Sequence, residues 1–305
     1  METEAKSGIR KLQVDFTCDF RCEKCERFFQ CKNPEKLKIF DRRRMSRARK
    51  TMGKIKRKIA VCAGKGGVGK SMLTTNLAVS LAMGESKVAV MDSDFDGSCI
   101  PRMLGALDKK LALTPKGIEP VEGFLGIKVV AMANIMDEED TTTWFHELRR
   151  NATEEFVAHV NYGELDYLLI DLPPGTSSDA VNTMEYIPDL DGMVIVTNPT
   201  EVSQGVALRA GMMAIEGGVK IIGIIENMSG YVCGQCKNVF YPLKKGGAKV
   251  LAKQLQTEFL GRVPLDPKAS YASDHGVPFV HATPESPASE AVRSIVEKII
   301  EIIEQ

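Results

Sequence analysis

Residues 64–71 have the types and spacing of a loop that binds nucleotide phosphates. They match the pattern G-x4-G-K-S with Gly64, Lys65, Gly66, Gly67, Val68, Gly69, Lys70 and Ser71. Glycines let such a loop turn its backbone N–H groups toward phosphate oxygens. Lys70 would reach the β- and γ-phosphates, and the Ser71 hydroxyl would bind Mg²⁺. Lys65 is a further cation, which would act either in the same site or across a dimer interface toward a neighbouring triphosphate.

Acidic side chains at the ends of two other apolar runs would complete a Mg²⁺–nucleotide site. Asp171 ends the run LLID, and we expect it to hold Mg²⁺ directly or through water. Asp92 and Asp94 end the run VAVMDSD, and one of them would orient the attacking water. The alternative interpretation is that these carboxylates only cap helices or belong to turns. Three segment ends converging on one phosphate loop favour the functional interpretation.

A pair of cysteines, Cys233 and Cys236, has the spacing C-x-x-C and follows another apolar run. Two thiolates fill two positions of a tetrahedral metal site or two corners of an iron–sulfur cluster, but not four. A symmetric dimer that brings two pairs together is the simplest completion. Two interpretations compete with this one. The pair is either a redox dithiol or half of a zinc site that the N-terminal cysteines complete.

Four further cysteines, Cys18, Cys22, Cys25 and Cys31, form the pattern C-x3-C-x2-C-x5-C. Four thiols within this short segment suffice for a cubane cluster or for a zinc site with four thiolate ligands, and spacing alone does not separate the two. Unliganded thiols are the third possibility. Cys62 and Cys99 stand alone, and Cys62 is expected to be a small core residue.

The segments that position these residues alternate in type from residue 58 onward. Apolar, β-rich runs predict buried strands over 58–64, 87–94, 127–134, 167–174, 192–199 and 220–228. Helices are expected near 70–83, 144–160, 201–215, 246–258 and 287–304. This alternation predicts an α/β fold, a doubly wound and mostly parallel sheet with helices on both faces. Ligands bind such sheets at the carboxyl ends of the strands, where the motifs fall.

Charge divides the 305 residues into two regions. Residues 1–58 carry 19 basic and 8 acidic side chains, a net charge of +11, and the remaining residues carry −11. We therefore predict a cysteine-rich extension at 1–40, a basic linker at 41–57 and an ATPase domain at 58–305. The basic stretch is a solvated linker or helix face, or else a docking patch for an acidic partner or nucleic acid. It lacks interleaved aromatic residues, so nucleic-acid binding is not expected.

No apolar run approaches the roughly 18 residues that a membrane-spanning helix needs, and the N-terminus lacks the pattern of a signal peptide. We therefore expect a cytoplasmic protein that does not bind membranes. Disulfides are rare in the reducing cytosol. The grouped cysteines are accordingly expected to hold metal or to do redox chemistry.

Seven segments, taken together and in order, resemble the Mrp/ApbC family of MinD-like P-loop ATPases over about residues 58–300. They are GKGGVGKS, DSDFDGSCIPRMLG, LDYLLIDLPPGTSSD, NPTEV, IIENMSGYVCGQC, FLGRVPLDP and SDHGVPF. The resemblance implies an ATP-dependent homodimer in which paired C-x-x-C motifs bind one bridging [4Fe-4S] cluster. It also implies that the cluster passes to apo iron–sulfur proteins and that hydrolysis is slow.

Individual roles follow from the same resemblance. Lys65 resembles the signature lysine that acts across the dimer, Asp94 the switch aspartate near the attacking water, and Asp171 the aspartate linked to Mg²⁺. Asn227 resembles a contact to the adenine base. Met72 stands where the family usually has Thr, a change away from the Mg²⁺ ligand that we expect to be tolerated in the nucleotide-binding loop.

The N-terminal cysteines resemble a eukaryotic-type scaffold subgroup that adds a ferredoxin-like cluster. Cys22, Cys25 and Cys31 match that subgroup's last three ligands, whereas Cys18 departs from it because the first cysteine there lies farther upstream. Two other functions share the fold and stay open. One is a positioning ATPase of the MinD/ParA type, and the other is an ATP-driven reductase or activase that passes electrons through its cluster to a partner enzyme.

Overall fold

The computed structural model describes residues 33, 45–136, 146–175, 178–236 and 238–305. Residues from Arg47 to Gln305 form one compact unit, and residues 1–46 are a separate unit. The N-terminal cysteine group (18–31) lies outside the described residues, as do residues 137–145. The fold below is that of the compact unit.

The described part of this unit contains a nine-stranded sheet. Its strands are, in spatial order, β10 (Val239–Phe240), β9 (Ile221–Val232), β8 (Gly192–Thr197), β1 (Ile55–Ala63), β7 (Leu165–Asp171), β2 (Val88–Asp92), β6 (Lys128–Val130) and β5 (Val121–Glu122), with β11 (Glu258–Leu265) paired to β9. The short strands β5 and β10 are antiparallel to their neighbours, and all the other pairs are parallel. The predicted mostly parallel sheet is therefore confirmed.

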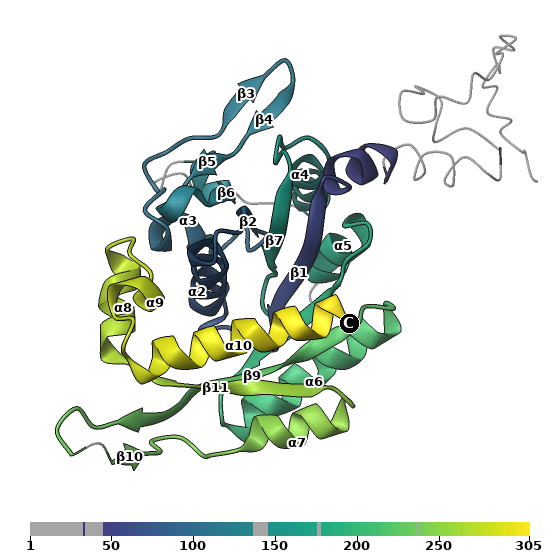
Figure 1. Ribbon diagram of the computed structural model, residues 1–305. Helices are drawn as coiled ribbons and strands as arrows, with labels where there is room; N and C mark the ends of the chain where they lie inside the picture. Colours follow the sequence, from purple (N-terminus) through teal and green to yellow (C-terminus); the bar gives the residue numbers. More distant parts are fainter. Residues whose placement is uncertain (1–32, 34–44, 137–145, 176–177, 237) are drawn as a thin grey trace, which may run out of the picture. The chain divides into compact units, whose positions relative to one another are not determined.

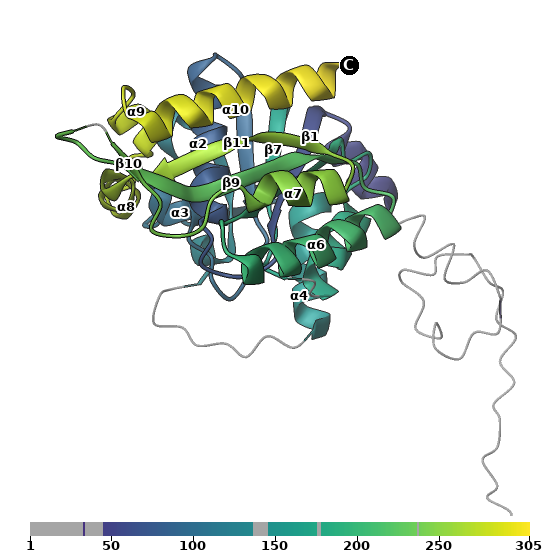
Figure 2. The ribbon, with the colours of Figure 1, turned by 90° about the horizontal axis from the view of Figure 1, so that it is seen from below.

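Helices pack on both faces of this sheet, and Figure 2 shows α10 on one side with α6 and α4 on the other. The helices are α2 (Lys70–Met83), α3 (Ile100–Met103), α4 (His146–Ala158), α5 (Ser178–Tyr186), α6 (Glu201–Glu216), α7 (Gly247–Gln254), α8 (Pro267–Asp274), α9 (Phe279–Ala282) and α10 (Pro287–Glu304). A separate hairpin joins β3 (Ala112–Thr114) to β4 (Gly117–Glu119). Two short 3-10 helices, Phe124–Gly126 and Met132–Asn134, flank β6.

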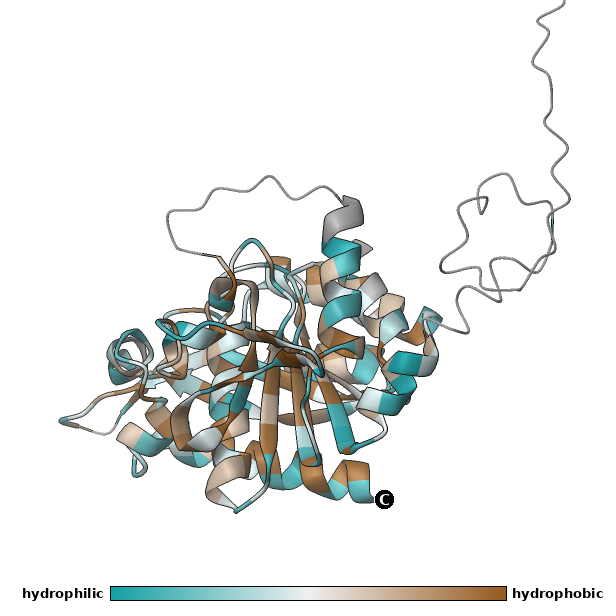
Figure 3. Ribbon diagram, turned by 90° about the horizontal axis from the view of Figure 1, so that it is seen from above, coloured by the Kyte–Doolittle hydropathy of each residue, from teal (hydrophilic) through white to brown (hydrophobic). Residues whose placement is uncertain are grey.

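Two hydrophobic layers hold the helices to the sheet, because successive strand residues point to opposite faces. In β1, Ile59 and Val61 belong to the layer that includes α2 and α10, whereas Ala60 and Cys62 belong to the layer that includes α4 and α6. Both faces of the central strands are thus covered, which explains why their sequences are apolar without alternation. Figure 3 shows the hydrophobic residues concentrated along these strands.

The basic segment contributes more to the fold than the sequence suggested. β1 begins at Ile55 instead of 58, since Ile55 pairs with Leu165 and is buried. Residues 45–52 are helical, and Ala48 and Met52 are also buried in the core. The frequent Lys and Arg residues obscure these three apolar positions in the sequence.

Other element boundaries also differ from expectation. The strand expected over 127–134 ends at Val130, and a 3-10 helix follows it. The helix expected over 246–258 ends at Gln254, and residue 258, which was expected to be its last residue, is instead the first residue of β11. β11 and the short helices α3, α5, α8 and α9 were not expected. Among the described helices none is both long and apolar enough to cross a membrane.

Candidate functional site

The phosphate-binding loop connects the end of β1 to the start of α2, as the sequence predicts. Gly69 precedes the helix with a φ of 83°, a left-handed conformation that favours glycine. Gly64 packs directly on α6, where a Cβ would overlap the backbone of Ala207. These two glycines therefore set the path of the loop, and α2 directs its positive N-terminal end at the same place.

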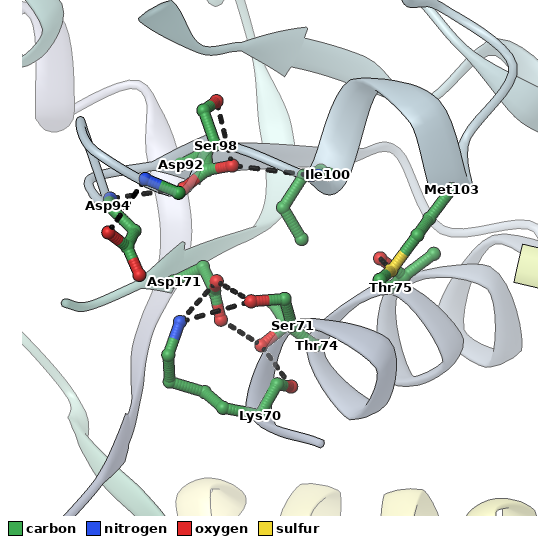
Figure 4. Close-up of polar contacts among 11 residues, drawn as sticks. Lys70, Ser71, Thr74, Thr75, Asp92, Asp94, Ser98, Ile100, Met103 and Asp171 are labelled. Atoms are coloured by element: carbon green, nitrogen blue, oxygen red, sulfur yellow. Dashed lines mark hydrogen bonds and ion pairs between the residues drawn. The ribbon is translucent and has the colours of Figure 1, made fainter. Parts of the chain in front are cut away.

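A buried polar cluster joins this loop to the end of β7 (Figure 4). Lys70 forms an ion pair with Asp171 Oδ2 and donates to Ser71 Oγ at 3.2 Å. Ser71 Oγ donates to the same Asp171 oxygen at 2.5 Å. Burial alone would lower the pKa of Lys70, but the negative charge of Asp171 raises it above its usual value. The ammonium is therefore charged in the folded protein.

Thr74 also belongs to this cluster, although the sequence pattern did not identify it as a site residue. Its hydroxyl lies 2.5 Å from Asp171 Oδ1 and 3.0 Å from the Lys70 carbonyl oxygen, and its side chain is buried. Position 74 is four residues after Lys70 and so lies on the same side of α2. That spacing was the available signal. Ser71 and Thr74 together fix the Asp171 carboxylate.

Asp92 and Asp94 have different environments. Both Asp92 oxygens accept hydrogen bonds within its own loop, from Asp94 N at 3.0 Å, Ser98 Oγ at 3.0 Å and Ile100 N at 3.3 Å. Burial, together with the nearby charge of Asp171, raises the pKa of Asp92 to about 7. Asp94 is only partly buried, and it accepts a hydrogen bond from Gly97 N at 3.2 Å. Asp92 therefore holds the loop, and Asp94 is the more accessible carboxylate.

The other predicted nucleotide-loop residues lie as follows. Lys65 is partly exposed, and Val68 is buried. Met72 is partly buried and packs against the hydrophobic layer of α2 and α10. Asn227 at β9 is buried and donates to the Val68 carbonyl oxygen at 2.8 Å. Asn227, for which a contact to adenine is predicted, therefore also binds the backbone of the nucleotide loop.

Cys233 and Cys236 lie in the turn of a hairpin formed by β9 and β10, which projects at the lower left of Figure 1. Cys233 N donates to the Asn238 carbonyl oxygen at 2.9 Å, which closes the turn. Cys236 is exposed and Cys233 partly exposed. Within the described residues no three His, Cys, Asp or Glu side chains are grouped as metal ligands. One hairpin thus offers two thiols.

The remaining two described cysteines lie apart from the hairpin. Cys62 is buried in β1, and burial raises the pKa of its thiol to about 12, as expected of a core residue. Cys99 precedes α3 and is partly buried, and burial raises the pKa of its thiol. Both residues thus lie outside the C-x-x-C turn.

Residues 54–300 match a family model described as the NUBPL iron-transfer P-loop NTPase. The chain is 42% identical over 288 residues to an iron-sulfur cluster carrier protein of Methanocaldococcus jannaschii, which covers 94% of this chain and 98% of the relative. It is 37% identical to a cytosolic Fe-S cluster assembly factor, the NUBP2 homolog of Trichoplax adhaerens, across 83% of this chain and 97% of that protein.

Solved structures of nucleotide-binding proteins are also similar to this chain. A nucleotide-binding protein of Archaeoglobus fulgidus in complex with ADP is 37% identical, with a TM-score of 0.68 across 76% of this chain and 91% of that one. The cell division ATPase MinD of Pyrococcus furiosus has a TM-score of 0.59 across 81% of this chain and 99% of its own, at 23% identity. The second likeness concerns the fold alone.

Proposed function

The chain belongs to the NUBPL iron-transfer P-loop NTPase family, and from this we propose that it is an ATP-dependent carrier of iron–sulfur clusters. Its relatives at 42% identity are named iron-sulfur cluster carrier proteins, and they match the chain nearly from end to end. The observation that carries the proposal is the exposed C-x-x-C turn. This turn follows β9, and Asn227 of the same strand donates a hydrogen bond to the nucleotide loop. The cluster is cargo, and ATP hydrolysis is the activity that accompanies it.

Cluster binding is proposed to need two chains. A [4Fe-4S] cluster takes four thiolates, and Cys233 and Cys236 supply two. A homodimer with two-fold symmetry brings two identical hairpins together and completes the set. Exposure of the turn favours this arrangement, because neither thiol has to leave a packed core to meet the partner's hairpin.

The nucleotide site is proposed to use the polar cluster of α2 and β7. Ser71 Oγ and the Asp171 carboxylate offer oxygen ligands 2.5 Å apart, a donor set that suits Mg²⁺ and through which the ion would neutralise phosphate charge. Lys70 would bind the β- and γ-phosphates. Asp94 would orient the attacking water, and Lys65 would reach a triphosphate across the dimer. The loop residues Gly64 to Met72 would surround the phosphates, and Asn227 would contact adenine.

The N-terminal cysteines Cys18, Cys22, Cys25 and Cys31 are proposed to hold a second cluster, with zinc as the alternative. Apo iron–sulfur proteins are the proposed acceptors of the carried cluster, in the cytoplasm. The basic stretch between the cysteines and β1 would then connect two cluster-binding parts of one carrier.

A transfer assay tests the proposal. Reconstituted wild-type protein should restore activity to an apo iron–sulfur enzyme, and Cys233→Ala/Cys236→Ala protein should lose most of that transfer. Gln235→Ala is the matched control, since Gln235 is an exposed residue of the same turn and its substitution leaves both thiols in place. Equal transfer by the double variant and the wild type would reject the carrier assignment. Transfer lost in the control as well would show that the loss is not specific to the two thiols.

A further inference from the structure

A buried carboxylate, Glu226, lies on β9 between the nucleotide loop and the cysteine hairpin. Its side chain has no exposed surface. Glu226 and Asn227 are consecutive, so their side chains point to opposite faces of the sheet. Asn227 contacts Val68 of the nucleotide loop. Glu226 faces α7 on the other side, as its contacts show. One strand therefore carries a contact to the loop and a contact to the hairpin base at adjacent positions.

The Glu226 carboxylate gathers donors from both ends of the hairpin segment. Oε1 accepts from Ser229 Oγ at 2.6 Å, on the side where the chain enters the hairpin, and from Gly246 N at 3.3 Å, where it leaves. Oε2 accepts from Ala248 N at 2.9 Å, in the first turn of α7. Arg262 Nε on β11 donates to Oε1 at 2.9 Å. One side chain thus closes the base of the segment 229–246.

These donors also keep the carboxylate charged. Burial by itself would raise the pKa of Glu226, but the hydrogen bonds from Ser229, Ala248 and Arg262 hold it below its usual value. A buried carboxylate with this many donors is stable only while they stay in place. Moving either end of the segment therefore breaks hydrogen bonds to a buried carboxylate.

The backbone bends where the strand passes into the hairpin. Met228 has a φ of 56° and Gly230 a φ of 85°, both in the left-handed region. For a residue with a long side chain such as Met this conformation is strained, and it persists when neighbouring contacts enforce it. Asn227 and Ser229 lie on either side of Met228, and both are fixed by hydrogen bonds. The bend is therefore set by the same contacts that link loop and hairpin.

A second connection runs through α6. Gly64 of the nucleotide loop packs on the backbone of Ala207, and at Gly247 a Cβ would overlap the side-chain amide of Gln204. Lys244 also forms an ion pair with Glu201 at the start of this helix. The base of the hairpin therefore contacts both β9 and α6, and each of these elements also contacts the nucleotide loop. Glu226 binds the base of the hairpin through the backbone N–H groups of Gly246 and Ala248.

We infer that Glu226 is the positioning residue through which the nucleotide loop sets the exposure of Cys233 and Cys236. A shift of the loop reaches Asn227 through the Val68 carbonyl, β9 moves with it, and Glu226 carries the movement to both ends of the hairpin segment. The inference rests on the proposed function in one respect: the hairpin is taken to be the cluster site. Its test uses the thiols themselves and needs no cluster.

The test is the rate at which iodoacetamide alkylates Cys233 and Cys236, measured by mass spectrometry on reduced full-length protein from which iron and zinc have been removed. Rates are compared with Mg²⁺–ADP and with a Mg²⁺-bound, non-hydrolysable ATP analogue. In wild type the two nucleotides should give rates that differ at least threefold. In Glu226→Gln, which keeps the side-chain volume but replaces an acceptor with a donor, that ratio should fall to about one. Nucleotide affinity should stay within twofold of wild type.

Glu258→Gln is the matched control, because Glu258 is an exposed carboxylate on neighbouring β11, and it should keep the wild-type ratio. If Glu226→Gln does not fold, Ser229→Ala removes one donor and should reduce the ratio by at least half. A wild-type ratio in whichever of these two variants folds would overturn the inference, and so would equal rates in wild type with both nucleotides. Wild type that transfers clusters but shows equal rates would reject only the coupling. Nucleotide-dependent rates without cluster binding would reject only the carrier function.

Discussion

Ser71 Oγ lies 2.5 Å from Asp171 Oδ2, so a hydrogen bond joins the first turn of α2 to the last residue of β7. The two residues are 100 positions apart in the sequence. Lys70 and Thr74 bind the same carboxylate, which is buried. The loop and the strand end are therefore joined into one buried polar unit.

Thr74→Val removes a hydroxyl that Asp171 uses while keeping the side-chain shape. We expect the free energy of unfolding to fall by about 1–3 kcal/mol, because a buried charged acceptor loses a donor. Thr75→Val is the matched control, since Thr75 is also buried but its hydroxyl donates to the Met103 sulfur, at 3.7 Å, instead of to Asp171. Urea denaturation of both variants measures the difference. Equal losses would show that Asp171 does not depend on Thr74.

Lys70→Ala and Lys65→Ala should separate two roles. Lys70→Ala leaves Asp171 buried without its cation, so we expect a loss of about 3–5 kcal/mol in stability as well as weaker nucleotide binding. Lys65 is partly exposed, so Lys65→Ala should leave stability within about 0.5 kcal/mol of wild type. ATP hydrolysis should nevertheless fall at least about 100-fold, as for other cations that stabilise phosphoryl transfer.

Thermal unfolding and a phosphate-release assay on the two lysine variants provide the measurements. A Lys65→Ala protein that hydrolyses ATP at the wild-type rate would remove Lys65 from the catalytic set. A Lys70→Ala protein as stable as wild type would show that the buried ion pair is not needed by the fold.

Asp92 should make the nucleotide-free protein less stable as pH rises. Its pKa is about 7 in the folded protein, whereas an unfolded aspartate titrates near 4. The folded state therefore holds the proton more tightly, and stability from this group declines as pH rises from about 4 to about 7. Asp92→Asn cannot ionise, so the stability of wild type relative to this variant should fall by about 2–3 kcal/mol between pH 5 and pH 8.

Urea unfolding of wild type and Asp92→Asn across that pH range supplies the comparison. Titrating groups far from Asp92 are common to the two proteins, so their contributions cancel in the difference, and the remaining pH dependence belongs to Asp92 and the charged groups beside it. A difference that stays constant with pH, or grows in favour of wild type, would contradict the raised pKa of Asp92.

The start of the compact unit can be tested by truncation. A fragment beginning at Met45 keeps Ala48, Met52 and Ile55, which are buried, whereas a fragment beginning at Lys58 lacks all three. Losing a buried Met and a buried Ile costs about 2–5 kcal/mol for each large side chain. We expect the first fragment to unfold cooperatively near the wild-type midpoint and the second to be strongly destabilised. Circular dichroism during heating distinguishes them, and equal midpoints would show that residues 45–57 are dispensable.

The nucleotide loop could be read from the sequence because its chemistry is local. Gly64 to Ser71 are contiguous, and the glycine positions that the structure requires are those of the pattern. Asp171 was found for a related reason, since a carboxylate that ends an apolar run stands out. Thr74 did not stand out, because its partner is 97 residues away and only the folded chain brings them together.

Strand β11 and Glu226 show what the sequence pattern conceals. β11 contains Gly261 and Pro264, which argue against a strand, but it pairs only with β9, and an edge strand tolerates them. Glu226 lies in the predicted strand over 220–228 as a charge among apolar residues. That mismatch was visible, but its meaning depends on donors from Gly246, Ala248 and Arg262, which the sequence does not place near it.

The most direct test of the carrier function is iron and acid-labile sulfide analysis after anaerobic reconstitution of the full chain. Wild type and Cys233→Ala/Cys236→Ala are compared, together with their masses in solution. We expect the double variant to bind about four fewer iron and four fewer sulfide per pair of chains, the content of one [4Fe-4S] cluster shared between two hairpins. Equal iron and sulfide in the two proteins would contradict the claim that the hairpin thiols hold the carried cluster.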